Sequence, residues 1–349
     1  MSATVLPIAL TLGDAAGIGP EIIAQSFLRE PEMLRACFVA GDVQAMRRAL
    51  AVVQGPVPLP VVQIATPAQV AQLPPRCLPV LQVGEALAPV AWGQVSAAAG
   101  EFAGRCVLWA ADAALRGEVA ALVTAPLHKE ALSAAGAPYD AYPGHTEMLQ
   151  AAAARHAGVA VDAMPVRMML ANDELRTVLV SIHVSLRDAL AAVTVNNVLQ
   201  TILITHAALL RTLGRAPRIA VAGVNPHAGE GGLFGREELD TVIPAIEAAR
   251  AQGCQVFGPY APDTVFMRAR HAAGHPGEFD VVVAMYHDQG LIPVKYLGVE
   301  QGVNVTLGLP LVRTSPDHGT AFDIAGTGRA DPSSLLAAIR MAKLLGGQR

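Results

Sequence analysis

Short apolar runs rich in β-branched residues alternate with helix-like segments along most of the chain. The first run covers residues 6–12. Residues 20–29 follow, with proline and glutamate at positions that suit the start of a helix. Residues 95–115 have helical character and precede a strand-like run at 119–124, and a closing helix is expected at 332–345. This alternation predicts an α/β fold with mainly parallel strands.

Length and composition narrow the class of protein. At 349 residues the chain is long enough for two α/β domains of ordinary size. Hydrophobic residues make up 52% of it, and the net charge of −4 gives no long-range attraction to nucleic acid or acidic membranes. The mean hydropathy is +0.40, yet polar residues and prolines interrupt every apolar stretch before the roughly 18 residues that a membrane span needs. We therefore expect neither a nucleic-acid partner nor a membrane partner.

The start of the chain and its cysteines indicate a compartment. The apolar N-terminal run lacks the cationic region and the small-residue cleavage site of a signal peptide, so we expect a cytoplasmic protein. The four cysteines lie far apart and form no CxxC pair, which predicts buried thiols in a reducing compartment. They are Cys37, Cys77, Cys106 and Cys254.

Three of the apolar runs end in a histidine. The runs and their terminal histidines are 177–183 with His183, 218–227 with His227 and 280–287 with His287. Ligands of open parallel sheets bind at the carboxyl ends of the strands, so three imidazoles delivered there could converge on one divalent metal ion. A single histidine at such a position is more often a hydrogen-bonded core or loop residue. Three in the same topological position favour a metal site and an enzyme.

Two loops carry further polar chemistry. Residues 225–232 are the most glycine-dense loop, and they exceed the 2–6 residues of an ordinary strand-to-helix connection, which favours a functional role. His145 and Thr146 follow Gly144 at the expected start of another helix. Such a helix start, with a hydroxyl donor and an imidazole, suits an anion. An N-cap threonine without a ligand is an equally good interpretation.

The segment 293–314 places Lys295, Asn304 and Arg313 among apolar residues. Isolated cations there would extend to the surface, whereas a group of polar residues could clamp a phosphate or carboxylate. Further on, residues 318–328 contain three glycines and an aspartate. No GxGxxG motif follows any strand, so a dinucleotide, if one binds, is best placed at this loop.

Five segments together resemble one enzyme family. They are 11–21 (TLGDAAGIGPE), 124–129 (TAPLHK), 144–147 (GHTE), 225–232 (NPHAGEGG) and 286–290 (YHDQG). In this order, within a match over residues 7–345, they resemble the 4-hydroxythreonine-4-phosphate dehydrogenases of pyridoxal 5′-phosphate (vitamin B6) biosynthesis. Separately, residues 318–332 are similar to the NAD loop of isocitrate and isopropylmalate dehydrogenases, whose fold the family shares.

The resemblance implies a two-domain isocitrate/isopropylmalate dehydrogenase-like fold, with mainly parallel sheets and an active-site cleft between domains. Residues 1–129 with 305–349 would form the cofactor-side α/β domain, and residues 130–304 the domain with metal, substrate and dimer contacts. The resemblance also implies a homodimer with shared active sites. The apolar run 293–310 suits a two-fold interface, although a buried pair of strands would look the same.

The resemblance further implies roles for particular residues. The metal ligands, for zinc, magnesium or cobalt, would be His183, His227 and His287, with His287 reaching across from a second subunit. The phosphorylated substrate would be held by His145, Thr146, Lys295, Asn304 and Arg313. NAD or NADP would contact the loop with Gly319, Asp323, Gly326 and Gly328. No catalytic residue beyond the metal site is assigned.

The implied reaction is NAD(P)-dependent, metal-assisted oxidation of 4-phosphohydroxy-L-threonine to a β-keto acid, which loses CO₂ to give 3-amino-2-oxopropyl phosphate. Leu12, Asp14 and Ala15 stand where biosynthetic members more often have Pro, Glu and Pro, and Ala125 replaces a usual glycine. These departures leave open a paralogous dehydrogenase of 4-phospho-D-threonate or erythronate. A cis-dihydrodiol dicarboxylate dehydrogenase is a further alternative, although the resemblance implies that those relatives lack the His-Thr pair. Phosphate acyltransferases of this general fold, which do not need three histidines, and a solute-binding or regulatory protein are the alternatives of other classes.

Overall fold

The computed structural model describes residues 6–53 and 58–347. The chain forms two compact units: unit 1 comprises Met1–Pro165 with Leu309–Arg349, and unit 2 comprises Val166–Gly308. The sequence placed residues 130–165 with the second unit. In the structure, α5 (His145–Ala157) packs against α3 (Ala97–Leu115), and this contact keeps the segment in unit 1.

Unit 1 contains a parallel sheet in the order β3-β4-β2-β1-β5-β12. Its strands are β1 (Ile8–Thr11), β2 (Cys37–Gly41), β3 (Val61–Ile64), β4 (Leu78–Gln82), β5 (Ala121–Thr124) and β12 (Arg313–Pro316). Every residue of β1, β2 and β5 is buried. Strands covered on both faces bury both sets of side chains, which explains the continuous apolar runs in the sequence.

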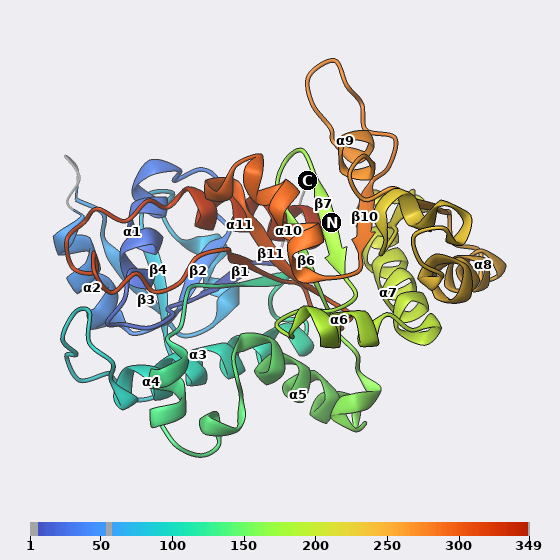
Figure 1. Ribbon diagram of the computed structural model, residues 1–349. Coiled ribbons are helices and arrows are strands. Elements are labelled where there is room, and N and C mark those ends of the chain that lie inside the picture. Colours follow the sequence, from blue (N-terminus) through green and yellow to red (C-terminus); the bar gives the residue numbers. More distant parts are fainter. Residues whose placement is uncertain (1–5, 54–57, 348–349) are drawn as a thin grey trace. The chain divides into compact units, whose positions relative to one another are not determined.

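The helices of unit 1 pack on its sheet and on one another (Figure 1). They are α1 (Gly19–Arg29), α2 (Val43–Val52), α3, α4 (Lys129–Ala134), α5 and α11 (Ser333–Leu345), with short helices at Pro67–Gln72, Tyr139–Ala141 and Val161–Ala163. α3 packs on β1, β2 and β5, and α11 on β5 and β12. Gly100 lets α3 approach α4 closely, because a Cβ there would stand 2.0 Å from the carbonyl oxygen of Ala131.

Unit 2 has strand order β11-β6-β7-β10-β8-β9. Its strands are β6 (Arg167–Ala171), β7 (Arg176–Leu179), β8 (Ile219–Ala222), β9 (Val256–Tyr260), β10 (Val281–Ala284) and β11 (Val303–Leu307). β6 pairs antiparallel with both β7 and β11, and the remaining pairs are parallel. The mainly parallel α/β class predicted from the sequence is confirmed.

The helices of unit 2 pack on this sheet and on one another. They are α6 (Leu186–Ala192), α7 (Val195–Leu213), α8 (Ile243–Ala251), α9 (Val265–Ala269) and α10 (His287–Tyr296), with short helical turns at Pro226–Gly232, Glu238–Val242 and Val299–Gln301. α7 packs on β6, β7 and β11, while α10 packs on β6, β7 and β10. The parallel strands β7, β8 and β10 therefore bring the three histidine loops to one edge of the sheet.

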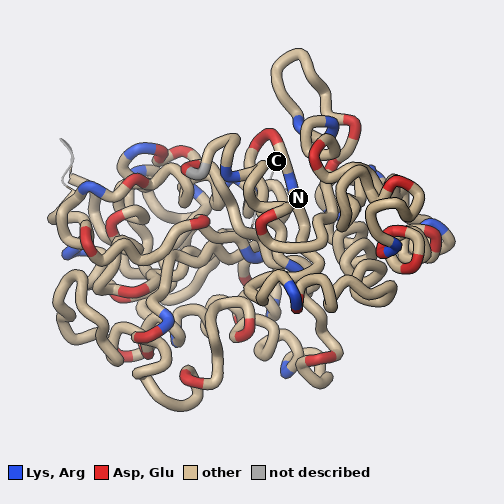
Figure 2. Tube along the Cα trace, viewed as in Figure 1, with Lys and Arg blue, Asp and Glu red and all other residues tan. Residues whose placement is uncertain are grey.

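Two sequence expectations can be compared with these elements. The run 293–310 includes the end of α10 and the buried strand β11, so most of its apolar residues belong to the core. On α10, however, Tyr296 is 90% exposed, and Ile292, which immediately precedes the run, is 63% exposed. The four cysteines are all free and buried, as predicted. Acidic and basic residues are interspersed along the described chain (Figure 2).

No single helix among the described residues is long and apolar enough to cross a membrane. One bent pair of helices, α6 with α7, is long and apolar enough when the two are taken together, by length and composition only.

Candidate active site

His183 and His287 lie side by side in unit 2. The centroids of their rings are 5.6 Å apart, and both rings line an open pocket of about 340 Å³. The loops that carry them follow β7 and β10, and Ser181 Oγ joins these loops by donating a 2.9 Å hydrogen bond to the carbonyl oxygen of Met285. The structure thus brings together two of the three predicted metal ligands.

His227 occupies a strained loop beyond β8. Residues 227–231 all have left-handed backbone conformations, with φ of +52° at His227, +53° at Ala228 and +44° at Glu230. His183 has φ of +45°. Such conformations cost non-glycine residues about 1–3 kcal/mol each and gather at functional sites, so they support a ligand-binding role for both histidines.

Two buried side chains hold the histidine loops in place. The carboxylate of Glu238, only 2% exposed, accepts hydrogen bonds of 2.7 Å from the backbone N–H groups of Val224 and Asn225. Gln289 donates to the carbonyl oxygen of Gly223 at 2.7 Å and accepts from the N–H of Met285 at 2.7 Å. The sequence analysis assigned no role to Glu238 or Gln289, although Gln289 lies within the quoted segment 286–290.

The polar surroundings of the histidines fit a divalent metal. His287 Nδ1 is 2.7 Å from the carboxylate of Asp288, and His227 Nδ1 is 3.4 Å from that of Glu230. A carboxylate at Nδ1 orients an imidazole and leaves Nε2 for a metal, and imidazole suits zinc or cobalt. Within residues 6–53 and 58–347, however, no three such groups of this chain lie together at metal-binding distances. The His227 ring instead packs edge-on against Phe234, with centroids 6.1 Å apart.

Positive groups surround the start of α5 in unit 1. Arg313 is 5% exposed and donates to Thr124 Oγ1 through Nε at 3.0 Å and Nη2 at 2.8 Å. Burial lowers the pKa of Arg313 to about 10, despite the opposing attraction of Glu147. The guanidinium is therefore still charged at neutral pH, as an anion site requires.

His145 begins α5 beside this arginine. Its ring is hydrogen-bonded to the backbone of Ala125, and its buried Nε2 has no hydrogen-bond partner among the described residues. Burial, followed by the charges of Arg313 and Lys129, lowers the pKa of His145 well below its ordinary value. The ring is therefore neutral at pH 7. Lys129, to which the sequence analysis assigned no role, completes the positive surroundings.

Thr146 is the second residue of α5 and is half-buried. The other two residues predicted to hold substrate are in unit 2. Lys295 is exposed in the last turn of α10, and Asn304 is half-buried on β11. The five substrate residues are thus divided between the units, and the assignments of Lys295 and Asn304 rest on the resemblance.

The predicted cofactor loop lies in unit 1 and is held by α1. The carboxylate of Glu21 accepts hydrogen bonds from the N–H groups of Gly326 and Gly328, the latter at 2.9 Å. Glu21 is fully buried, whereas Asp323 and Gly319 of the same loop are exposed. Glu21 was quoted in the first glycine motif but given no contact with this loop. The chain thus preforms the turn and leaves Asp323 accessible to a ligand.

Comparison with known proteins shows which family combines these features. Residues 33–342 match the family described as "Pyridoxal phosphate biosynthetic protein PdxA". The chain belongs to this family. The resemblance noted in the sequence is thereby confirmed, and the chain is an enzyme, a dehydrogenase.

Individual relatives match over nearly the whole chain. A protein of Beijerinckia indica named 4-hydroxythreonine-4-phosphate dehydrogenase is 52% identical over 340 residues, covering 97% of this chain and 95% of that protein. A Pectobacterium atrosepticum protein named D-threonate 4-phosphate dehydrogenase is 46% identical over 343 residues, covering 97% and 98%. The crystal structure of 4-hydroxythreonine-4-phosphate dehydrogenase from Klebsiella pneumoniae matches with a TM-score of 0.86 and 43% identity, covering 99% of each chain.

Proposed function

We propose that this PdxA-family enzyme oxidises 4-phosphohydroxy-L-threonine with NAD or NADP and a divalent metal ion. The product is a β-keto acid that decarboxylates to 3-amino-2-oxopropyl phosphate. The adjoining rings of His183 and His287 are the main structural support for the metal-assisted chemistry. The 52% identity to a relative named for this substrate supports the choice of alcohol.

The role proposed for each group follows from the chemistry of its side chains. His183, His227 and His287 would hold zinc, cobalt or magnesium, which lowers the pKa of a bound hydroxyl and stabilises the carbonyl oxygen that forms. A bound nicotinamide would supply the hydride acceptor. The protein orients the substrate by gripping its phosphate away from the reacting carbon.

The phosphate grip would combine the N–H groups at the start of α5 with Thr146 and Arg313. The helix is 13 residues long, and Gly144 at its N-cap provides no side chain to cap these N–H groups. Lys295 and Asn304 would add the remaining contacts. The cofactor would use Gly319, Asp323, Gly326 and Gly328.

A second candidate substrate is 4-phospho-D-threonate or the related erythronate. It is favoured by the 46% identity to a relative named for D-threonate 4-phosphate and by Asp14 and Ala125, which depart from the usual biosynthetic pattern. NAD(P)⁺ reduction measured with each phosphorylated substrate, with and without Zn²⁺, Co²⁺ or Mg²⁺, separates the two. Reduction with neither substrate under any metal would contradict the proposed function.

We also propose a homodimer with shared metal sites, because one chain brings together His183 and His287 but not His227. Inactive His227→Ala and His287→Ala subunits, unfolded and refolded together, should recover about a quarter of wild-type activity by random pairing. Mixing His183→Ala with His287→Ala identifies the shared ligand. Because the two rings are 5.6 Å apart in one chain, we expect both histidines of a site to come from the same subunit, and this mixture should then recover no activity. If the partner subunit supplied His287 instead, the mixture would recover activity. A monomeric mass in solution would contradict shared sites.

The four free, buried cysteines support a reducing compartment, and we propose the cytoplasm. Activity retained in a strong thiol reductant, with no disulfide detected by mass spectrometry of the untreated protein, is expected. A native disulfide would contradict this location.

A further inference from the structure

Several buried polar atoms of unit 1 have no hydrogen-bond partner among the described residues, and two of them lie on loops that contact each other. These two are Asp14 Oδ2 and His128 Nδ1. Asp14 is fully buried, and its other carboxylate oxygen, Oδ1, accepts a 2.8 Å hydrogen bond from the N–H of Ala16. An unpaired buried polar atom costs about 1–3 kcal/mol, so each of these two atoms requires an explanation.

The loops that carry these atoms are in direct contact. The N–H of Asp14 donates a 2.9 Å hydrogen bond to the carbonyl oxygen of Pro126. Gly13 makes this approach possible, since a Cβ there would stand 2.5 Å from the same oxygen. Burial raises the pKa of Asp14, while the Ala16 N–H and the nearby imidazole of His128 lower it. The imidazole of His128 therefore lies close enough to influence the Asp14 carboxylate.

Both residues border the glycine loop of the proposed cofactor site. The ring of His128 stacks on that of Phe322, with centroids 4.6 Å apart and an interplanar angle of 16°. The N–H of Ile18, in the same loop as Asp14, donates a 3.0 Å hydrogen bond to the carbonyl oxygen of Thr320. The unpaired atoms thus belong to the part of unit 1 that would meet a dinucleotide.

We propose that Asp14 and His128 form a subsite for a carboxamide, and that its occupant is the nicotinamide amide of the cofactor. Asp14 Oδ2 accepts a hydrogen bond from the amide NH₂, and His128 donates one from Nδ1–H to the amide oxygen. An acceptor beside a donor matches the two ends of an amide, whereas a phosphate or carboxylate would be repelled by Asp14. This inference rests on the proposed use of NAD(P).

The variant Asp14→Asn tests the carboxamide subsite most directly. Because Oδ1 must remain an acceptor for the Ala16 N–H, the substitution places an NH₂ group where Oδ2 stood, facing the amide NH₂ of the ligand. Isothermal titration calorimetry would compare NAD⁺ with its 3-acetylpyridine analogue, which replaces the amide NH₂ with a methyl group. Wild-type protein should prefer NAD⁺ about tenfold or more, and Asp14→Asn should lose that preference.

Two further variants separate ligand contact from folding. His128→Phe retains the stack on Phe322 and should also weaken NAD⁺ binding. Asp42→Asn alters a buried carboxylate whose oxygens already accept hydrogen bonds from Ala45 N, Gln82 Nε2 and Leu87 N, so it should keep the preference for NAD⁺. Equal affinity of wild-type protein for the two nucleotides, or an unchanged preference in Asp14→Asn, would overturn the subsite and leave an ordered water as its occupant. Failure of wild-type protein to bind either nucleotide would overturn the proposed cofactor as well.

Discussion

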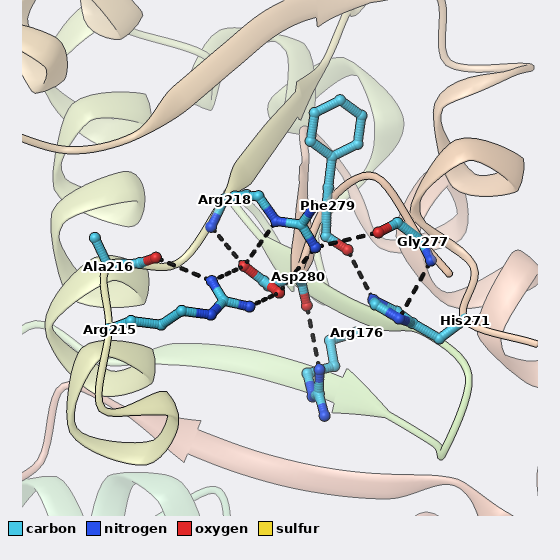
Figure 3. Close-up of polar contacts among 8 residues, drawn as sticks. All are labelled: Arg176, Arg215, Ala216, Arg218, His271, Gly277, Phe279 and Asp280. Atoms are coloured by element: carbon cyan, nitrogen blue, oxygen red, sulfur yellow. Dashed lines mark hydrogen bonds and ion pairs between the residues drawn. The ribbon is translucent and has the colours of Figure 1, made fainter. Parts of the chain in front are cut away.

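The polar residues at the two ends of strand β10 differ in burial and in hydrogen bonding. At the amino end, Asp280 is 5% exposed and accepts hydrogen bonds of 2.7 and 2.8 Å from Arg215 and of 2.7 Å from the N–H of Arg218 (Figure 3). At the carboxyl end, the His287 side chain is 41% exposed and lines a pocket beside His183. Removing a partner from a buried, hydrogen-bonded charge destabilises a fold, whereas exposed polar groups in strained loops remain available to a ligand.

At the amino end of β10, a hydrogen-bond network surrounds the carboxylate of Asp280. Arg218 also donates to the carbonyl oxygen of Gly277 at 3.1 Å, and His271 Nε2 lies 3.0 Å from the carbonyl oxygen of Phe279 (Figure 3). Burial by itself would raise the pKa of Asp280, but the hydrogen bonds of Arg215 and Arg218 lower it well below its ordinary value. This end of the strand therefore contributes stability, and we expect it to contribute nothing to turnover.

The largest effect should come from the carboxyl edge. His227→Gly should reduce turnover to background and lower bound metal, while the free energy of unfolding stays level or rises by about 1 kcal/mol, because glycine accepts φ of +52° without strain. Metal analysis, activity and thermal melting test this together. The control is Ala228→Gly, at φ of +53°, which relieves similar strain without removing an imidazole and should remain active. Wild-type turnover in His227→Gly would remove this residue from the site.

The comparison extends to the buried guanidinium of Arg313 in unit 1. Arg313→Met should raise KM for the phosphorylated substrate about 10- to 150-fold, as expected for loss of a charge-assisted hydrogen bond worth about 1.5–3 kcal/mol. The free energy of unfolding should stay level or increase, since burial of a charge is costly and the substitution replaces it with an apolar chain of similar length. Steady-state kinetics with the phosphorylated and dephosphorylated alcohols provide the measurement. If both alcohols were equally good substrates of the wild-type enzyme, Arg313 would not bind a phosphate.

The smallest effect on activity belongs to the amino end. Asp280→Asn should lower the free energy of unfolding by about 1–3 kcal/mol at pH 7 and leave kcat unchanged. Since the pKa of Asp280 is lowered on folding, the stabilisation is complete above about pH 4 and is lost as the pH falls further, so the gap between the two proteins should then close. Urea unfolding at several pH values measures it. Asp240→Asn, which removes an exposed pair with Arg236, should change stability by less than about 1 kcal/mol. A pH-independent gap would mean that the charge of Asp280 contributes nothing.

Much of the fold was predictable because the apolar runs and helix starts are local signals. The strands before His183, His227 and His287 appear in the structure as β7, β8 and β10, though each ends several residues before its histidine. Left-handed conformations occur at His183 itself and at His227, Ala228 and Glu230. Left-handed φ at histidine or alanine has no signature in the sequence, because tertiary contacts impose it against local preference.

The supporting side chains were less predictable for a related reason. Glu21 bonds to glycines 305 and 307 residues away, and Gln289 bonds to a carbonyl 66 residues away. A glutamate in the first turn of a helix looks locally like a residue that favours the helix dipole, so its distant partners could not be inferred. The boundary near residue 165 was missed similarly, because only the packing of α5 on α3 reveals it.

The Gln289 side chain uses both ends of its amide, one on the loop after β8 and the other on the loop after β10. It therefore acts as a spacer of fixed length between the loops that carry His227 and His287. Length changes farther out in either loop can be absorbed without altering this spacing, whereas Gln289→Glu would place a carboxylate oxygen against the carbonyl of Gly223 and push the loops apart. Sequence changes that alter substrate specificity should therefore be tolerated better in the outer parts of these loops than next to the strands from which the loops start.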